Sequence, residues 1–199
     1  MEQSKVQGPK SKGKAVMKDY SPAIIEAAKK IKLVALDVDG VLTDGRITYS
    51  SSGEELKSFN VRDGHAIKLA FRAGLTVAVI TGRESPMVQR RCAELGIKLL
   101  YQGIKEKRVI LGDVMERTGH TFSEIAFMGD DVVDLPVMMS VGLGCSPSNA
   151  ASEVLERSDL VTIARGGNGA VRELVFFILQ TQGKLEGIIE RYISPDPPV

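Results

Sequence analysis

Four short runs of apolar residues, at residues 33–36, 77–80, 125–128 and 141–145, each stop at small or acidic residues. Continuous apolar runs of this kind are typical of strands that are buried on both faces of a parallel sheet. Helix-length segments with apolar residues spaced by three and four alternate with these runs, at residues 66–71, 87–95, 109–115 and 135–139. Strands that alternate with helices predict an α/β fold with a doubly wound, mainly parallel, Rossmann-like sheet.

Two further segments complete the predicted domain. An apolar face at residues 170–180 predicts a helix that packs against the sheet. Residues 46–59 break the strand–helix rhythm, because a β-prone stretch, a Ser-Ser-Ser-Gly turn and a second extended stretch together predict a β-hairpin. The hairpin directly follows the first strand, so we expect a small flap at the carboxyl edge, where open α/β sheets bind ligands. We predict one domain over residues 21–190, with no large cap domain, between a disordered leader at residues 1–20 and a tail at residues 191–199.

The charge balance of the chain excludes several kinds of partner. Among 199 residues, 26 Lys and Arg stand against 25 Asp and Glu, which gives a formal charge of +1. This balance gives no excess of positive charge that would attract nucleic acid or anionic lipid. No apolar run approaches the roughly 20 residues needed to cross a bilayer. Cys92 and Cys145 lie far apart and lack CxxC spacing, which indicates neither a disulfide framework nor a zinc site. We therefore predict a cytoplasmic protein that binds neither nucleic acid nor membrane.

The first strand runs directly into the motif Asp37-Val38-Asp39-Gly40. Strand alternation would point the two carboxylates to opposite faces, but a loop opened by the glycine can bring both into one crevice. The pair would then supply a nucleophile or metal ligand and a neighbouring acid or base. An ordinary acidic strand end with a turn glycine explains the motif equally well when it is considered alone.

Three later signals each follow a predicted strand. Thr81-Gly82 offers a hydroxyl and an exposed amide for phosphate oxygens, and Gly129-Asp130-Asp131 offers an acidic pair for a hard cation such as Mg²⁺. Lys107 can supply a fixed positive charge, and Lys105 competes with it for this role. A helix N-cap at Thr81 and a solvated surface charge at Lys107 are the plain alternatives.

The succession DxDG, TG, a lone Lys and GDD resembles the haloacid dehalogenase-like phosphatase superfamily over residues 31–182. The resemblance implies a magnesium-dependent mechanism in which Asp37 is the nucleophile and Asp39 the general acid and base. It also implies that Thr81 and Lys107 bind the phosphate. The implied metal contacts are Asp37, Asp39 through its backbone carbonyl, and Asp130, with Asp131 or Asp134 as alternatives to Asp130. A phosphoacceptor receiver domain uses similar residues, but its acidic pair precedes the phosphorylated aspartate, whereas here the DxDG motif comes first.

More local features are similar to the family of 3-deoxy-D-manno-octulosonate 8-phosphate phosphatases, namely residues 41–45, 53–64 and 166–173. This resemblance implies an acidic sugar phosphate as the substrate and a homotetramer with active sites near the subunit interfaces. A phosphatase for a nine-carbon acid sugar and an inactive sugar-binding module are the alternatives. Arginine forks suit the anionic groups of such a substrate, and Lys68 stands where the family often has arginine. The implied substrate-binding residues are Asp39, Asn60, Val61, Arg62, Asp63, Gly64, Lys68, Arg83, Arg91 and Lys107.

Overall fold

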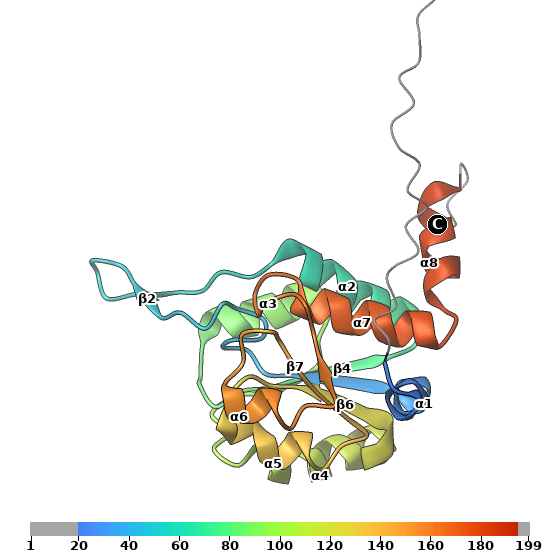
Figure 1. The fold of residues 1–199 in the computed structure, drawn as a ribbon. Helices are drawn as coiled ribbons and strands as arrows, with labels where there is room; N and C mark the ends of the chain where they lie inside the picture. The colour runs from blue at the N-terminus through green and yellow to red at the C-terminus, as the bar shows by residue number, and fades with distance from the viewer. Residues whose placement is uncertain (1–19, 195–199) are drawn as a thin grey trace, which may run out of the picture.

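The structure, a computed structural model, describes residues 20–194 of the chain. Its centre is a parallel sheet of six strands in the order β5-β4-β1-β6-β7-β8 (Figure 1). The strands are β1 (Leu33–Leu36), β4 (Thr76–Ile80), β5 (Leu99–Tyr101), β6 (Ile125–Met128), β7 (Leu143–Ser146) and β8 (Leu160–Val161). The predicted α/β fold with a doubly wound parallel sheet is confirmed, and the described residues include no large cap domain.

Helices cover both faces of this sheet. In Figure 1, α2, α3 and α7 lie over one face, and α4, α5 and α6 lie under the other. The helices are α1 (Pro22–Lys30), α2 (Val61–Arg72), α3 (Pro86–Leu95), α4 (Lys107–Thr118), α5 (Leu135–Met138), α6 (Ser152–Leu155), α7 (Ala170–Thr181) and α8 (Leu185–Ile193), with the 3₁₀ turns η1 (Phe122–Glu124) and η2 (Val132–Asp134). None of the helices between residues 20 and 194 is both long and apolar enough to span a membrane.

The two faces of the sheet form two separate parts of the core. Along β1, Val34 and Leu36 pack with the side chains of the α2–α7 layer, while Leu33 and Ala35 pack with those of the α4–α5 layer. All four residues are fully buried. Successive side chains of a strand point to opposite faces, so a strand covered on both faces must be apolar at every position. This requirement explains the continuous apolar runs in the sequence.

Local signals fix several helix ends. Asn60 caps α2, because its Oδ1 accepts a hydrogen bond of 2.8 Å from the Arg62 amide. Pro86 occupies the first turn of α3, and Gly96 ends that helix in the left-handed conformation with φ +83°. The cap at Asn60 makes α2 begin five residues before the predicted segment 66–71. The apolar spacing marks only the apolar side chains of the helix and misses its first turn.

The structure differs from the predicted organisation at three places. β7 begins at Leu143 rather than at residue 141, because the Gly142 amide donates to the Phe122 carbonyl at 2.7 Å and the chain enters the strand only after this contact. β5 and β8 were not predicted, since they contain only three and two residues. The predicted boundary at residue 190 falls inside α8, which continues to Ile193. The leader predicted at residues 1–20 lies outside the described residues except for its last position, and so do residues 195–199 of the tail.

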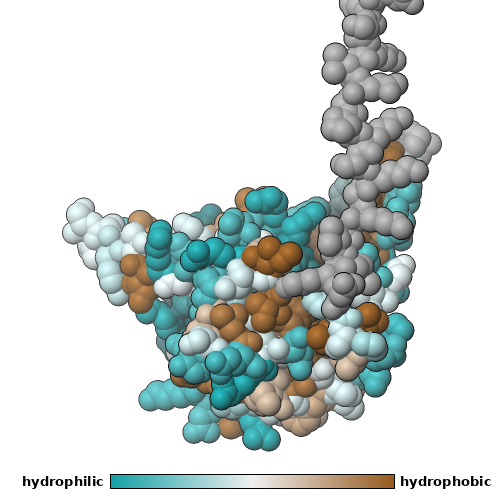
Figure 2. All heavy atoms as spheres, in the orientation of Figure 1, coloured by the Kyte–Doolittle hydropathy of each residue, from teal (hydrophilic) through white to brown (hydrophobic). Residues whose placement is uncertain are grey.

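The hairpin predicted at residues 46–59 is present as two short antiparallel strands. β2 (Thr48–Tyr49) pairs with β3 (Glu55–Leu56), so that Thr48 lies opposite Leu56 and Tyr49 opposite Glu55. The hairpin projects from the body of the molecule in Figure 1, and Figure 2 shows pale residues at its tip with apolar residues nearer its base. Ile47, Tyr49 and Leu56 are each about half exposed or more.

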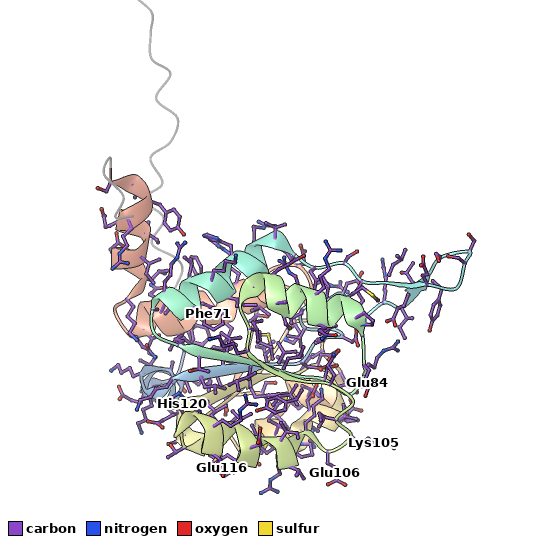
Figure 3. The ribbon with its side chains drawn as sticks, turned by 180° about the vertical axis from the view of Figure 1, so that it is seen from behind. Phe71, Glu84, Lys105, Glu106, Glu116 and His120 are labelled. Carbon is purple, nitrogen blue, oxygen red and sulfur yellow. The ribbon has the colours of Figure 1, made fainter. Side chains whose placement is uncertain are left out.

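The hairpin marks the functional edge of the sheet. In Figure 3, Glu84 and Lys105, which follow β4 and β5, lie at the edge from which the hairpin projects. Phe71 and His120, which precede β4 and β6, lie at the opposite edge. The residues that follow the parallel strands therefore share one edge, where such sheets form their binding crevices.

Candidate active site

The loop after β1 places Asp37 at the base of a cavity at the carboxyl edge. The Asp37 amide donates to the Met128 carbonyl at 3.0 Å, which continues the sheet pairing into the first residue of the motif. Gly40 has φ +87°, and a Cβ atom on this residue would lie 1.9 Å from Asp130 Oδ2. The glycine is therefore required both by its backbone conformation and by the close approach of the second acidic motif.

The glycine-rich segment at residues 166–169 closes the outer side of this loop. A Cβ atom on Gly166 would lie 1.6 Å from the Gly40 carbonyl oxygen. The Gly167 amide donates to the Val41 carbonyl at 2.9 Å, and the Gly166 amide donates to Asn149 Oδ1 at 2.8 Å. Only residues without a side chain allow the two loops to pack at this distance.

Lys107, the first residue of α4, lies beneath the cavity with only 4% of its surface exposed. Its Nζ lies 2.7 Å from Asp37 Oδ1 and 2.7 Å from Asp134 Oδ1. Burial lowers the pKa of Lys107, but the two carboxylates raise it by more, so the ammonium remains charged. A solvated surface charge is therefore the wrong interpretation of Lys107. Lys105 also lines the cavity but does not take this buried position.

Three carboxylates meet at the cavity base. One oxygen from each of Asp37, Asp130 and Asp134 lies within 4.8 Å of the others. Burial, followed by the charges of Asp37 and Asp134, raises the pKa of Asp130 to about 7. Burial and the charge of Asp134 raise the pKa of Asp37 to about 6, although Lys107 opposes this rise. Oxygen ligands and uncompensated negative charge suit a hard divalent cation such as Mg²⁺.

Asp134 also organises the neighbouring backbone. Its side chain is fully buried, and Oδ2 accepts hydrogen bonds from the amides of Asp130 at 3.0 Å and Asp131 at 3.4 Å. Asp131 instead caps η2, since its Oδ1 accepts a hydrogen bond of 2.7 Å from the Val132 amide. The sequence predicts Asp134 only as an alternative metal ligand. The sequence carries no specific signal for this role, because Asp130 lies in the loop before η2 and shares no helix with Asp134.

The cavity has a volume of about 480 Å³ and brings together the predicted catalytic residues. Asp37, Asp39, Thr81, Arg83, Lys107 and Asp130 all line it. Thr81 is buried, and its Oγ1 accepts a hydrogen bond of 3.4 Å from the Arg83 amide. The N-cap position of α3 belongs to Ser85, so Thr81 is not the cap of that helix.

The Asp39 carboxylate lies among three charged residues, of which only Arg83 is predicted from the sequence to belong to the site. Lys57 from the hairpin is hydrogen-bonded to Asp39 Oδ1, and the Arg83 Nε lies 3.8 Å from Oδ2. Glu55 contacts both cations, at 3.2 Å from Lys57 Nζ and 3.0 Å from Arg83 Nη2. The available signal was the charged pair Glu55 and Lys57 on either side of an apolar residue in a strand-like segment, which places both on one face.

The other predicted substrate-binding residues do not line this cavity. Asn60 caps α2 and also donates from Nδ2 to the Gly167 carbonyl at 3.3 Å. Asp63 is buried, and its two carboxylate oxygens accept hydrogen bonds from the amides of Gly169 at 3.0 Å and Arg172 at 2.8 Å. Asp63 thereby joins α2 to the first turn of α7.

Three of the remaining residues of this predicted set are on the surface of α2, and the other two, Gly64 and Arg91, contact each other where α2 and α3 pack. Val61, Arg62 and Lys68 are exposed on α2. Arg91 packs under the first turn of α2, with its guanidinium carbon 6.0 Å from the centre of the Phe59 ring. A Cβ atom on Gly64 would lie 2.2 Å from Arg91 Nη2, so this glycine makes room for the arginine.

A scan against protein-family models finds no match, but individual proteins are clearly similar. The chain is 46% identical over 166 residues to the 3-deoxy-D-manno-octulosonate 8-phosphate phosphatase KdsC of Salmonella typhimurium, covering 83% of this chain and 88% of the relative. It is 45% identical over 170 residues to the KdsC of Escherichia coli strain K12, covering 84% of this chain and 90% of the relative.

Solved structures agree with these relatives. The 3-deoxy-D-manno-octulosonate 8-phosphate phosphatase of Moraxella catarrhalis, in complex with a magnesium ion, a phosphate ion and a KDO molecule, matches with a TM-score of 0.83 and 41% identity, covering 85% of this chain and 97% of that chain. The cobalt-bound deoxy-D-mannose-octulosonate 8-phosphate phosphatase of Haemophilus influenzae matches with a TM-score of 0.80 and 42% identity, covering 84% and 99%. With this identity over most of its length, the chain belongs to the 3-deoxy-D-manno-octulosonate 8-phosphate phosphatase family of the haloacid dehalogenase-like superfamily.

Proposed function

We propose that this protein is a magnesium-dependent phosphatase that hydrolyses 3-deoxy-D-manno-octulosonate 8-phosphate to 3-deoxy-D-manno-octulosonate and inorganic phosphate. This reaction supplies a precursor for lipopolysaccharide biosynthesis. The observation that carries the proposal is the buried Asp37 carboxylate at the cavity base, held 2.7 Å from Lys107 and beside Asp130 and Asp134, in a chain about 45% identical to phosphatases named for this substrate.

Asp37 is the proposed nucleophile. One of its carboxylate oxygens is held by Lys107, which leaves the other to attack the phosphorus atom. The new bond joins an Asp37 oxygen to phosphorus, the bond between phosphorus and the sugar oxygen breaks, and an aspartyl phosphate forms. Lys107 and the Thr81 hydroxyl are proposed to bind the phosphate oxygens, where a fixed positive charge stabilises the transition state in a partly dry site.

Asp39 is the proposed general acid and base. Its side chain lines the same cavity as Asp37 but is not part of the three-carboxylate cluster at the base. In the first step it gives a proton to the departing sugar oxygen. In the second step it takes a proton from the water that attacks the aspartyl phosphate, and phosphate and free Asp37 result.

Mg²⁺ is the cofactor. When bound, it offsets the repulsion between the Asp37 carboxylate and the phosphate dianion and helps to align the transferring group. We propose that Asp37, Asp130 and the backbone carbonyl of Asp39 hold it. Asp134 is assigned a supporting role, because its carboxylate is already engaged by Lys107 and by the Asp130 and Asp131 amides.

Arg83 is the proposed recognition residue for the carboxylate of the sugar. It lines the cavity, its side chain is 40% exposed, and its guanidinium can pair with a carboxylate through two hydrogen bonds. Asn60, Val61, Asp63 and Gly64 shape the first turn of α2 beside this cavity. Arg62, Lys68 and Arg91 also remain proposed contacts for the substrate, although they do not line the cavity that one chain forms.

We propose a homotetramer whose active sites lie near subunit interfaces. The hairpin exposes Ile47, Tyr49 and Leu56 beside a cavity that has no large cap, and a neighbouring subunit would both cover these residues and exclude water from the site.

The proposed location is the cytoplasm, in agreement with two buried cysteines that form no disulfide. Recovery of the protein in a membrane or periplasmic fraction would contradict this location.

The first prediction concerns the nucleophile. Asp37→Asn should lower kcat on 3-deoxy-D-manno-octulosonate 8-phosphate by about 10³-fold or more, because the amide cannot form an acyl phosphate. Phosphate release should be measured on this substrate, on a nine-carbon acid sugar phosphate and on a neutral sugar phosphate, with and without Mg²⁺. Wild-type turnover should be highest on the eight-carbon acid. Retained activity of the variant would exclude Asp37 as the nucleophile.

The second prediction concerns the pH dependence of metal binding. A carboxyl with a pKa of about 7 is mostly protonated at pH 6 and must lose its proton to bind a cation. Calorimetric Mg²⁺ affinity should therefore fall about tenfold from pH 8 to pH 6 through Asp130 alone. Folding raises the pKa of Asp130 from 3.8 to about 7. The protonated carboxyl therefore adds to the free energy of unfolding below about pH 4, and this contribution is lost as the pH rises through 7. Mg²⁺ should thus raise the Tm more at pH 8 than at pH 6.

Asp113→Asn is the matched control for this measurement, because Asp113 is half exposed on α4 and pairs with Arg117. Its Mg²⁺ affinity should match that of the wild type at both pH values. An affinity that does not change between pH 6 and pH 8 would show that the acidic cluster does not bind the ion.

The third prediction concerns specificity. Arg83→Ala should lower kcat/KM on the acidic sugar phosphate about 10- to 100-fold, the cost of about 1.5–3 kcal/mol for a hydrogen bond to a charged group. Turnover of para-nitrophenyl phosphate, which has no carboxylate, should change much less. Arg90→Ala is the control, because Arg90 is exposed on α3 and pairs only with Glu94 among the described ion pairs. Equal losses on both substrates would assign Arg83 to phosphoryl transfer or to the fold.

The fourth prediction concerns assembly. Sedimentation velocity should give the mass of four chains of 21.5 kDa each for the wild type. Replacement of Ile47 and Leu56 by serine should shift the protein toward smaller species, since both side chains are about half exposed on the hairpin. A monomeric wild-type protein at micromolar concentration would contradict the proposed tetramer.

A further inference from the structure

The Lys57 side chain is unusually buried for a lysine on a projecting hairpin. Its side chain is only 2% exposed, whereas its neighbour Leu56 is 52% exposed. Strand alternation accounts for the contrast, because Glu55 and Lys57 point to the body while Leu56 points to solvent. A buried ammonium is costly unless it is paired, and Lys57 is paired with Asp39 and with Glu55.

These residues form a closed set of alternating charges. Lys57 contacts Asp39 and Glu55, and Arg83 contacts the same two carboxylates, at 3.8 Å from Asp39 and 3.0 Å from Glu55. Two carboxylates and two cations balance, so the group carries no net charge. Its members come from three different segments, namely the loop after β1, the hairpin and the loop after β4.

The two oxygens of the Asp39 carboxylate are held from different sides. Oδ1 accepts a hydrogen bond from Lys57, and Oδ2 lies near Arg83. The contact with Lys57 is a hydrogen bond, whereas the 3.8 Å between Arg83 Nε and Oδ2 is too long for one, so Lys57 provides the stronger constraint. The position of the hairpin and the direction of the Asp39 carboxylate are thus joined through one side chain.

We propose that Lys57 is a positioning residue for Asp39: its ammonium, held in place by Glu55, fixes the carboxylate that transfers protons to and from the reacting oxygens. The inference rests on the proposed function, in which Asp39 is the general acid and base. It assigns a role in the reaction to the hairpin that goes beyond covering the cavity. A purely structural role, in which Lys57 only anchors the hairpin, is the alternative to be separated by experiment.

Steady-state kinetics of Lys57→Met provide the first test, since methionine keeps most of the side-chain length but lacks the charge. The kcat on 3-deoxy-D-manno-octulosonate 8-phosphate should fall by about 10- to 100-fold, less than the roughly 10²- to 10⁴-fold contribution of a general acid–base, because Asp39 itself remains, while KM changes by less than about threefold. Lys57→Arg should restore part of kcat. Lys98→Met, a change at an exposed lysine between α3 and β5, should leave both constants unchanged.

The Asp39→Asn background provides the second test. If Lys57 acts through Asp39, then Lys57→Met should change the residual kcat of Asp39→Asn by less than about twofold, because the group that it positions has already been removed. A full further loss in this background would show that Lys57 acts through the hairpin, and it would overturn the inference. Lys57→Gln, which keeps a hydrogen-bond donor, replaces Lys57→Met in both tests if circular dichroism shows that the latter does not fold.

The outcomes also separate this inference from the proposed function. Wild type and Asp37→Asn are assayed in the same series with the same substrate. Failure of the wild type to release phosphate would overturn the proposed function. An active wild type, an inactive Asp37→Asn and a Lys57→Met protein with unchanged kcat would overturn only the role of Lys57.

Discussion

One buried ammonium, that of Lys107, holds together the base of the catalytic cavity. It lies 2.7 Å from an oxygen of Asp37 and 2.7 Å from an oxygen of Asp134, while Asp130 adds a third carboxylate within 4.8 Å. A single positive charge cannot balance three carboxylates, so burial and mutual repulsion raise the pKa values of Asp37 and Asp130. The fold thereby maintains a site that favours a divalent cation, and the same charges hold Asp37, the proposed nucleophile, in place.

The topology of the sheet brings the residues of this site together. β1 lies between β4 and β6, so the segments that follow these three neighbouring strands meet at one edge. They deliver Asp37, Thr81 and Asp130, and the segment after β5 leads to Lys107. Close packing of glycines allows the loops to approach, since Gly40 has no side chain that would collide with Asp130. The hairpin then adds Lys57 from above, so that the base of the cavity and its outer wall are both fixed by pairs of opposite charges.

Much of this organisation could be predicted from the sequence, because apolar runs that end at reactive residues report both the strands and their carboxyl edge. The predicted strands at residues 33–36 and 125–128 coincide with β1 and β6, and the superfamily-like motifs converge on one cavity. The buried position of Lys57 could not be predicted, because an alternating charged pair in a turn-rich segment is also typical of a solvated hairpin. The hydrogen bonds of Asp63 could not be predicted either. Its carboxylate accepts them from the amides of Gly169 and Arg172, more than 100 residues later in the chain. Pairings of such long range depend on tertiary packing that local patterns do not report.

The stereochemistry of the reaction at phosphorus tests the central claim, that Asp37 accepts the phosphoryl group before water does. A phosphorothioate analogue of the substrate, made chiral by its sulfur and two oxygen isotopes and hydrolysed in water that carries the third isotope, reveals the configuration of the released thiophosphate. Two successive in-line displacements, first by Asp37 and then by water, predict overall retention of configuration. Inversion would show a single direct attack by water, and it would contradict the aspartyl-phosphate mechanism.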